Sequence, residues 1–394
     1  MQDNTIPFHR PSIGPEEVQA VREVLESRWL TTGPVTQKFE REFAAFVGCK
    51  YAVAVNSCTA ALHLALDAMG ITTGDEVLVP SYTFAATAEV VVYLGARPVL
   101  CDSLPGEFNI DPTDAARRIT PKTRAIIAVH IAGEPCDLQA LRKLAELHSI
   151  HLIEDAAHAL PASYDGQRIG SISEITAFSF YATKTITTGE GGMLTTNDQA
   201  YATRASIMRL HGISGDAWKR YTSQGSWYYE IIDAGFKSNM PDLLAALGLA
   251  QLKKAEAFHQ RRREIAEFYL RRFSSIEELQ MPPTGNVNTV HSWHLFILRL
   301  RPEALSSSRS DLIQQLKQAG IGSSVHFIPL HLHPYYRDHY GYCSGDFPHA
   351  EDAFTRCISL PIYPDMSDAE VKRVATAVEQ FIQKNCRRQH AYAE

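Results

Sequence analysis

The chain has 394 residues, of which 45% are hydrophobic and 21% charged, an ordinary globular composition that excludes a disordered, collagen-like or coiled-coil protein. Its 38 Lys and Arg residues against 44 Asp and Glu residues give a formal net charge of −6, so the overall charge does not favour nucleic-acid binding. At this length we expect one large domain and a smaller second one.

Neither a leader peptide nor a membrane span is expected. The first residues, MQDNTIPFHR, lack an apolar core, and no run of about 18 uncharged apolar residues occurs. The seven cysteines are an odd number without a CxxC spacing, and the nearest pair is Cys49 and Cys58. This usage indicates reduced thiols in a cytoplasmic protein.

The first half of the chain predicts two helices and then alternating strands and helices. Pro15 suits the first position of a helix over 15–27, and a second helix follows the break at Gly33-Pro34. The apolar segments expected as strands are 51–57, 75–81, 96–102, 123–133 and 151–157. The helices expected between them are 59–70, 83–95 and 137–148. Such alternation favours an α/β fold with a mostly parallel sheet and helices on both faces.

The C-terminal part of the sequence predicts a second α/β unit. Residues 240–273 are strongly helical, and the character changes near residue 280. The elements expected after that change are a strand at 293–300, a helix at 310–319, a strand at 321–327 and a last helix starting at the capping box Ser367-x-x-Glu370. We therefore expect an N-terminal segment and large domain over 1–275 and a small C-terminal α/β domain over 276–394.

Lys184 and Asp155 are the first candidates for chemistry. Lys184 lies between a short aromatic strand and a tight Thr- and Gly-rich turn, where a plain alternative is an edge-strand lysine. Asp155 ends the strand LIED, at the edge where parallel sheets place ligands, although helix capping is also common there. Together they suggest pyridoxal phosphate, which needs a lysine for covalent attachment and a carboxylate beside its ring nitrogen.

A phosphate cradle is expected where a strand meets a helix at Asn56-Ser57-Cys58-Thr59. Backbone amides and the hydroxyls of Ser57 and Thr59 suit a phosphate there, while plain helix capping by Ser57 is the alternative. Ser179 supplies a second hydroxyl near the lysine unless it is a satisfied strand serine. Phe84 suits stacking on a cofactor ring, but a lone Phe is usually part of a core.

These residues carry a resemblance to the DegT/DnrJ/EryC1/StrS family of sugar aminotransferases, which have the fold-type I architecture of pyridoxal-phosphate enzymes. The resemblance covers nearly the whole chain, and it is strongest to enzymes that act on UDP-linked 4-keto-sugars. The segments that carry it include NSCTAALHLAL, PSYTFAAT, IEDAAHA, FSFYATKTITTGEGGM, GFKSNMPDLLAALGLAQL and SSVHFIPLH. The lysine segment and IEDAAHA in this order are specific as a set, whereas GEGG or DAAH alone is weak.

The resemblance implies roles for single residues. Lys184 resembles the catalytic lysine that binds the cofactor, Asp155 the partner of the ring nitrogen, and Phe84 the stacking aromatic. His158 stands where many relatives carry Gln, near the phenolic oxygen of the cofactor. The remaining residues that the resemblance places at the cofactor are Ser57, Cys58, Thr59 and Ser179. The residues that it places near the substrate are Thr32 and His331.

The resemblance also implies a homodimer whose active site is shared between subunits. In relatives an Asn-Tyr-Arg-Met segment reaches the phosphate from the neighbouring subunit, and here that segment reads Lys237-Ser238-Asn239-Met240. Lys237 and Asn239 are therefore candidate cofactor contacts. Some members with UDP-linked 4-keto-pentose substrates show a Lys-Tyr-Asn version, so the change is compatible with activity.

The implied reaction is ping-pong amino transfer. L-Glutamate gives up its amino group and leaves as a keto acid, and a nucleotide-linked keto-sugar then takes the amino group, which we expect at C4, with Lys184 moving the proton in both halves. Retention of Lys184 favours amino transfer, because the similar sugar 3-dehydratases carry His there. Two alternatives are a non-nucleotide ketone such as a cyclitol as substrate, and a regulatory protein of this fold without turnover.

Other polar motifs predict ordinary structure. His326, His331 and His333 lack a carboxylate or cysteine at a familiar ligand spacing, so no metal site is expected. His291 and His294 around Trp293 are expected to be structural. The basic run at 259–272 is expected to be a solvated helix face.

Overall fold

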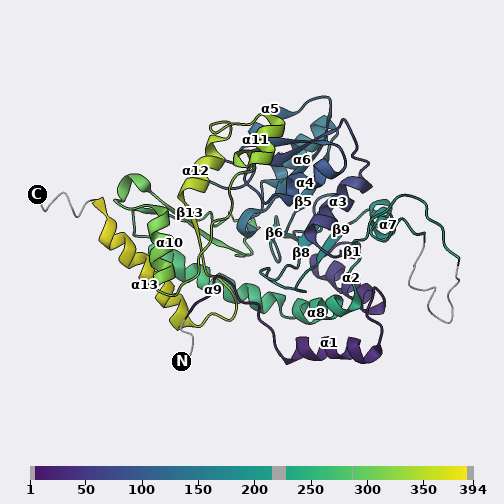
Figure 1. Cartoon of the computed structure of the whole chain (residues 1–394), viewed down its shortest axis with the longest axis horizontal. Coiled ribbons are helices and arrows are strands. Elements are labelled where there is room, and N and C mark those ends of the chain that lie inside the picture. The colour runs from purple at the N-terminus through teal and green to yellow at the C-terminus, as the bar shows by residue number, and fades with distance from the viewer. Residues whose placement is uncertain (1–4, 215–227, 286, 388–394) are drawn as a thin grey trace, which may run out of the picture.

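The computed structural model describes residues 5–214, 228–285 and 287–387. Figure 1 shows a larger part built around a twisted sheet and a smaller part that holds the C-terminal elements. The strands are β1 (Tyr51–Val55), β2 (Glu76–Pro80), β3 (Arg97–Cys101), β4 (Thr123–Val129), β5 (His151–Asp155), β6 (Ser163–Tyr164), β7 (Gln167–Arg168), β8 (Ile175–Ser179), β9 (Gly192–Thr196), β10 (Leu279–Gln280), β11 (Thr289–Val290), β12 (Phe296–Leu300) and β13 (Cys357–Leu360). The α-helices are α1 (Pro15–Ser27), α2 (Pro34–Val47), α3 (Cys58–Ala68), α4 (Ala86–Tyr93), α5 (Pro112–Arg118), α6 (Leu138–His148), α7 (Gln199–Met208), α8 (Asp242–Leu252), α9 (Ala255–Phe273), α10 (Arg309–Gln318), α11 (Pro334–Tyr340), α12 (Pro348–Arg356) and α13 (Asp368–Asn385).

The main sheet has seven strands in the order β1-β9-β8-β5-β4-β2-β3. Only β9 among these seven runs against the others, because it pairs antiparallel with both β1 and β8. This mostly parallel α/β fold confirms the fold class predicted from the alternating pattern. The parallel strands end at a common edge, and the loops that leave this edge carry most of the candidate residues.

Helices cover both faces of the sheet. Val77 and Val79 of β2 pack into the core beneath α3 and α4, while Leu78 between them packs into the opposite core with α2 and α6. All three side chains are fully buried. A strand buried on both faces reads as a continuous apolar run, which explains why the sequence shows no polar alternation there.

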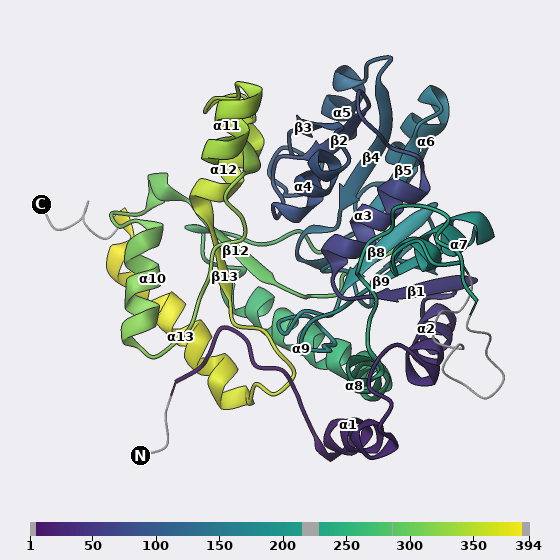
Figure 2. The same ribbon diagram turned by 45° about the vertical axis from the view of Figure 1, so that its right-hand side comes forward.

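The C-terminal elements form a third core around a three-stranded sheet of order β10-β12-β13. Ser367 caps α13 in a capping box with Glu370, as the sequence predicts. The N-terminal segment lies against this part (Figure 2), where the Ile6 amide donates to the Gly320 carbonyl oxygen at 2.8 Å. Because Phe258 at one end of α9 packs in a core of the large sheet and Phe273 at its other end in the third core, a domain division near residue 275 stays our prediction.

One expectation about an element differs from the structure. The strand expected over 321–327 is absent as a regular element, because Ile321 bridges to Ile6 and Ser324 bridges to Ser359, one residue at a time. The helical stretch predicted over 240–273 is confirmed, and it consists of two helices, α8 and α9, separated by a turn at 253–254.

The cysteines, the apolar helices and the possible metal ligands can now be located in the structure. All seven cysteines lie in the described residues, and all are free thiols. Across 5–214, 228–285 and 287–387, no helix combines the length and apolar character that crossing a bilayer requires. The same ranges hold no group of three His, Cys, Asp or Glu side chains placed to bind a metal ion.

Candidate active site

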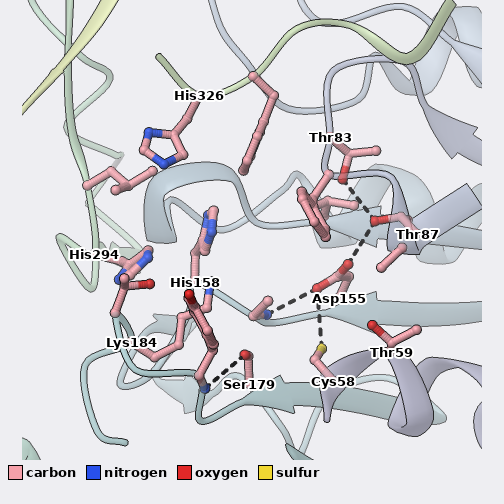
Figure 3. Close-up of a pocket in the computed structure, with 18 of the residues that line it drawn as sticks. Cys58, Thr59, Thr83, Thr87, Asp155, His158, Ser179, Lys184, His294 and His326 are labelled. Carbon is pink, nitrogen blue, oxygen red and sulfur yellow. Dashed lines mark hydrogen bonds between the residues drawn. The ribbon is translucent and has the colours of Figure 1, made fainter. Parts of the chain in front are cut away.

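A cavity of about 460 Å³ opens at the carboxyl ends of the parallel strands, beside the loops of the C-terminal part (Figure 3). This volume lies in the range of small-molecule and cofactor sites. The predicted residues that line it are Ser57, Cys58, Thr59, Phe84, Asp155, His158, Ser179 and Lys184. The fold thus brings together residues that are 127 positions apart in the sequence, from Ser57 to Lys184.

Asp155 ends β5 and points into the cavity (Figure 3). One carboxylate oxygen accepts from the Ala157 amide at 3.1 Å, and the other accepts from the Thr87 hydroxyl at 2.9 Å. Burial raises the pKa of this carboxyl group, although both hydrogen bonds and the Lys184 charge oppose that shift. The carboxylate therefore has a place for a further cationic partner.

Lys184 follows β8 on a tight turn, and its backbone amide donates to the Tyr181 carbonyl oxygen at 2.9 Å. Burial lowers the pKa of its amine from 10.5 to about 8, while Cys58 and Asp155 pull the other way. A lowered pKa increases the fraction of neutral amine near pH 7, and the neutral amine is the nucleophile.

The N-terminus of α3 forms the opposite end of the site. Ser57 caps this helix, because its hydroxyl oxygen accepts from the Ala60 amide at 3.1 Å. The amides of Cys58 and Thr59 belong to the first turn and have no partner within the helix, which leaves them suited to an anion. Gly192 packs on this turn so closely that a Cβ there would lie 2.4 Å from the Ser57 carbonyl group.

His158 is held in one tautomer by the backbone. The Ala132 amide donates to its Nδ1 at 3.3 Å, so the neutral ring carries its proton on Nε2. Burial, and then the charges of Lys184 and His326, hold the pKa of His158 well below its usual value. The ring stacks on Phe327, with centroids 5.9 Å apart. His158 is therefore a neutral, oriented N–H donor.

The cavity contains further residues for which the sequence analysis made no site assignment. Thr83 and Thr87 join hydroxyls at 2.9 Å in a chain that ends at Asp155. Their spacing of four positions at the start of α4 is the signal that a reader of the sequence could have used. His294, which was expected to be structural, and His326 also line the cavity.

Three predicted residues lie together outside the cavity of their own chain. Asn239 donates its side-chain amide to the Thr32 hydroxyl oxygen at 2.6 Å, and Lys237 donates to the Asn239 side-chain oxygen. The segment runs beside β1, where the Asn56 amide donates to the Ser238 carbonyl oxygen at 2.8 Å.

His331 is fully buried and does not line the cavity. Its Nδ1 lies 2.7 Å from the Ser81 hydroxyl and its Nε2 lies 2.9 Å from a Glu351 carboxylate oxygen. These contacts connect the loop after β2 to α12. His331 therefore packs against the loop that carries Phe84, on the side away from the cavity.

The donor set fits pyridoxal phosphate. A carboxylate at a strand end, an amine with a lowered pKa and a helix N-terminus face one cavity, and each matches one part of this cofactor: ring nitrogen, aldehyde and phosphate. Phe84 is 63% exposed, which leaves its ring free to cover a bound ring. When bound, the cofactor supplies an electrophilic aldehyde and a ring that withdraws electrons.

Comparisons with known proteins agree with this fit. Residues 11–379 match the DegT/DnrJ/EryC1/StrS aminotransferase family. The uncharacterized protein MJ1066 of Methanocaldococcus jannaschii is 50% identical, with 98% of this chain and 100% of that protein covered. The spore coat polysaccharide biosynthesis protein SpsC of Bacillus subtilis is 48% identical, with 97% of this chain and 98% of that protein covered.

The similar proteins of known structure include forms named for the cofactor. The sugar aminotransferase Spr1654 of Streptococcus pneumoniae, described as putative, in its PLP form superposes with a TM-score of 0.90 at 34% identity, covering 96% of this chain and 99% of that chain. The PMP form of the same protein superposes with a TM-score of 0.91. This chain therefore belongs to the DegT/DnrJ/EryC1/StrS aminotransferase family and is a sugar aminotransferase that depends on pyridoxal phosphate.

Proposed function

We propose that the protein transfers the amino group of L-glutamate to the C4 keto group of a nucleotide-linked keto-sugar. The observation that carries this proposal is the meeting of Lys184, Asp155 and the α3 N-terminus in one cavity. The naming of its relative SpsC for spore coat polysaccharide biosynthesis supports a product that enters a surface polysaccharide.

Each cavity residue has one proposed task at the cofactor. Lys184 binds it covalently, and Asp155 keeps its ring nitrogen protonated. Phe84 covers one ring face, and His158 donates its Nε2 proton toward the phenolic oxygen. The residues proposed to hold the phosphate are Ser57, Cys58, Thr59 and Ser179.

Lys184 also has the proposed task of proton transfer. Its pKa of about 8 is close to the pH of the reaction. The amine therefore accepts a proton and returns it at a small free-energy cost in either direction. Asp155 remains unprotonated in this scheme because the cofactor supplies the positive partner that the carboxylate lacks within the described chain. The hydroxyl chain from Thr83 through Thr87 holds that carboxylate in place.

A homodimer with a shared site is part of the proposal. Lys237, Asn239 and Thr32 form one hydrogen-bonded group outside their own cavity, which suits contacts to the cavity of a second subunit. The large exposure of Phe84 also suits a site that a second subunit covers. Light scattering of the purified protein tests the dimer, and a monomer at working concentration contradicts it.

The substrate is tested with the amino-loaded enzyme and a panel of ketones. We expect UDP-linked and other nucleotide-linked 4-keto-sugars to restore the visible absorption of the lysine-bound cofactor after glutamate has removed it. Ketones without a nucleotide, including a cyclitol ketone, serve as the contrasting arm. Restoration by the cyclitol alone contradicts the nucleotide-sugar proposal while leaving amino transfer intact.

A further inference from the structure

One wall of the cavity is built from histidine rings with unused nitrogen atoms. His294 is 5% exposed, and its Nδ1 is buried without a hydrogen-bond partner in residues 5–214, 228–285 and 287–387. His9, on the N-terminal segment, also lines this cavity, and its buried Nε2 has no hydrogen-bond partner among the described residues. The His294 ring lies 4.4 Å from that of His158, and Figure 3 shows it on the Lys184 side, away from Asp155. Buried polar atoms usually have a hydrogen-bond partner, so these two nitrogens indicate that a ligand supplies one.

A buried arginine stands directly behind this wall. Arg262 is fully buried, although the sequence predicts a solvated basic face for its helix. Its Nη1 donates to the carbonyl oxygens of His294 at 3.1 Å and Ile362 at 2.8 Å, both of which belong to residues lining the cavity. Its Nε and Nη2 atoms have no hydrogen-bond partner in the described part of the chain.

Within the described residues, no carboxylate lies beside Arg262 to neutralise its charge. Its contacts are carbonyl oxygens, and burial lowers the pKa of the guanidinium to about 9. A buried cation without a counter-ion is unfavourable, and an anion bound in front of it removes part of that cost. Among the described residues that line the cavity, the carboxylates are Asp155, which faces Thr87, and the exposed Glu190.

We infer that the His294 and His9 wall, with Arg262 behind it, binds the α-carboxylate of the amino donor. This inference rests on the proposed function, since it names the place where the donor of that reaction is recognised. His294 donates a hydrogen bond from Nδ1 to the carboxylate, and Arg262 supplies the positive field. Arg262 also fixes the His294 backbone, so it is a positioning residue.

The other anion in the reaction is the diphosphate of the sugar nucleotide. The donor carboxylate and this diphosphate differ in how far each must lie from the Lys184 amine. The carboxylate of an amino acid is attached to the carbon that carries the amine, so it must bind close to the Lys184 amine. His294, His9 and His158 all lie near enough to Lys184 for its charge to lower their pKa values. A diphosphate is held off the reacting carbon by a sugar ring and belongs farther out.

The test uses the holoenzyme and two unreactive probes, glutarate for the donor carboxylate and UDP for the nucleotide. Calorimetry measures the dissociation constant of each probe for the natural protein and for His294→Phe, which keeps an aromatic ring and removes the donor. We expect glutarate to bind about 10- to 100-fold more weakly to the variant, because a hydrogen bond to a charged group is lost. UDP binding stays within about twofold.

His63→Phe is the matched control. The buried Nε2 of His63 also lacks a hydrogen-bond partner in the part of the chain that the structure describes, but His63 does not line the cavity. Its replacement leaves glutarate binding unchanged. His294→Asn keeps a side-chain donor and is expected to recover part of the affinity, and it decides the question if His294→Phe does not hold cofactor.

The outcomes separate this inference from the function on which it rests. Equal glutarate affinity in the natural protein and in both His294 variants overturns the inference, and so does a loss confined to UDP. Amino transfer from glutamate by those variants with an unchanged donor KM overturns it too, although the proposed function survives. If the natural protein takes no amino group from glutamate, the proposed function fails first.

Discussion

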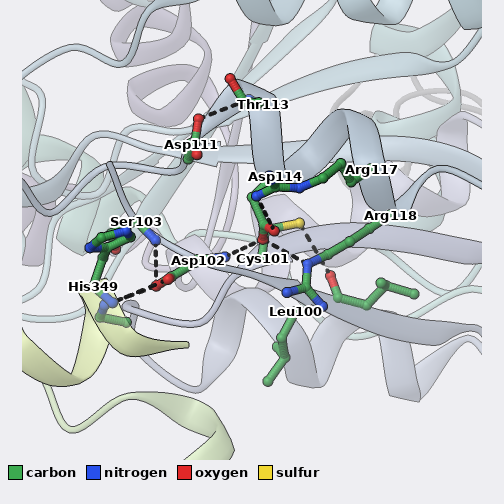
Figure 4. Close-up of polar contacts among 12 residues, drawn as sticks. Leu100, Cys101, Asp102, Ser103, Asp111, Thr113, Asp114, Arg117, Arg118 and His349 are labelled. Atoms are coloured by element: carbon green, nitrogen blue, oxygen red, sulfur yellow. Dashed lines mark hydrogen bonds and ion pairs between the residues drawn. The ribbon is translucent and has the colours of Figure 1, made fainter. Parts of the chain in front are cut away.

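Asp155 and Asp114 are two buried aspartates with opposite surroundings. Their exposed fractions are 5% and 6%. Asp114, on α5, accepts from the Arg118 Nε at 2.6 Å, from Arg117 at 3.1 Å and from the Asp102 amide at 2.7 Å (Figure 4). Burial alone raises the pKa of Asp114, but these bonds outweigh it and the pKa is lowered. The pKa of Asp155 is raised, because burial outweighs its hydrogen bonds to Ala157 and Thr87 and the charge of Lys184.

The comparison shows what distinguishes a structural carboxylate from one that waits for a ligand. Around Asp114 the chain supplies two cations, and Asp102 in turn accepts from the backbone of α12, with the His349 amide at 3.1 Å (Figure 4). Around Asp155 the chain supplies a hydroxyl, an amide, a thiol at 3.9 Å and the charge of Lys184, but no paired arginine among the described residues. The first site is complete in itself, and in the proposed function the second is completed by the cationic ring of the cofactor.

The largest expected effect is that of Lys184→Ala. The variant loses both the covalent bond to the cofactor and the base, so amino transfer falls by about 10⁴-fold or more. Absorption spectra and turnover measure the two losses. Lys143→Ala on α6 is the surface control, and a variant of Lys184 that still transfers amino groups contradicts the assignment.

Asp155→Asn is expected to have the next largest effect. Removing one partner of a buried charge pair costs about 3–5 kcal/mol, so cofactor-dependent activity falls by at least about 100-fold. Asp114→Asn leaves cofactor binding unchanged. A fluorescence titration with pyridoxal phosphate compares the two, and similar losses in both variants contradict the distinction between the sites.

The lowered pKa of Lys184 predicts a pH dependence for cofactor capture. The amine is neutral above its pKa of about 8, so the rate of covalent attachment rises with pH and levels off near pH 8. Below that pH the rate falls about tenfold per pH unit, because the neutral fraction falls in that proportion. Stopped-flow absorbance measures it, and a rise that continues to pH 10 shows an unshifted lysine.

The two aspartates also predict opposite effects on stability in the absence of cofactor. Asp114→Asn lowers the free energy of unfolding at pH 7 by about 1–3 kcal/mol, because hydrogen bonds to a charged group are lost. A depressed folded pKa gives stability that is present above the unfolded pKa and lost as pH falls through the folded pKa. The difference from the natural protein therefore disappears in acid.

Asp155→Asn is expected to leave the free energy of unfolding unchanged or to raise it. A raised folded pKa means that ionised Asp155 opposes folding of the cofactor-free protein above its unfolded pKa, so the variant is at least as stable at pH 7. Urea unfolding at several pH values measures both variants. Loss of stability in Asp155→Asn comparable to that in Asp114→Asn contradicts this reasoning.

The sequence predicts the sheet, and it predicts that Lys184 and Asp155 share one cavity, because apolar runs and strand-end residues are local signals. Lys184 and Asp155 could be paired through cofactor chemistry alone. Arg262 could not be placed, because a basic run on a helix looks the same whether one residue of it is solvated or buried under a loop. His294 could not be placed either, since only the fold brings β12 beside the loop after β5.

The missing strand at 321–327 has a similar cause. Val325 and Phe327 give the segment an apolar pattern, but its backbone bonds are divided between the N-terminal segment and β13. Long-range partners decide between a strand and an irregular segment, and a local pattern does not contain them.

The absorption spectrum of the purified protein with pyridoxal phosphate, before and after L-glutamate, tests the central claim most directly. A visible band that forms in the natural protein, is absent in Lys184→Ala and is removed by glutamate is the predicted result. Failure of the band to form at all contradicts the assignment of Lys184 and Asp155 to the cofactor.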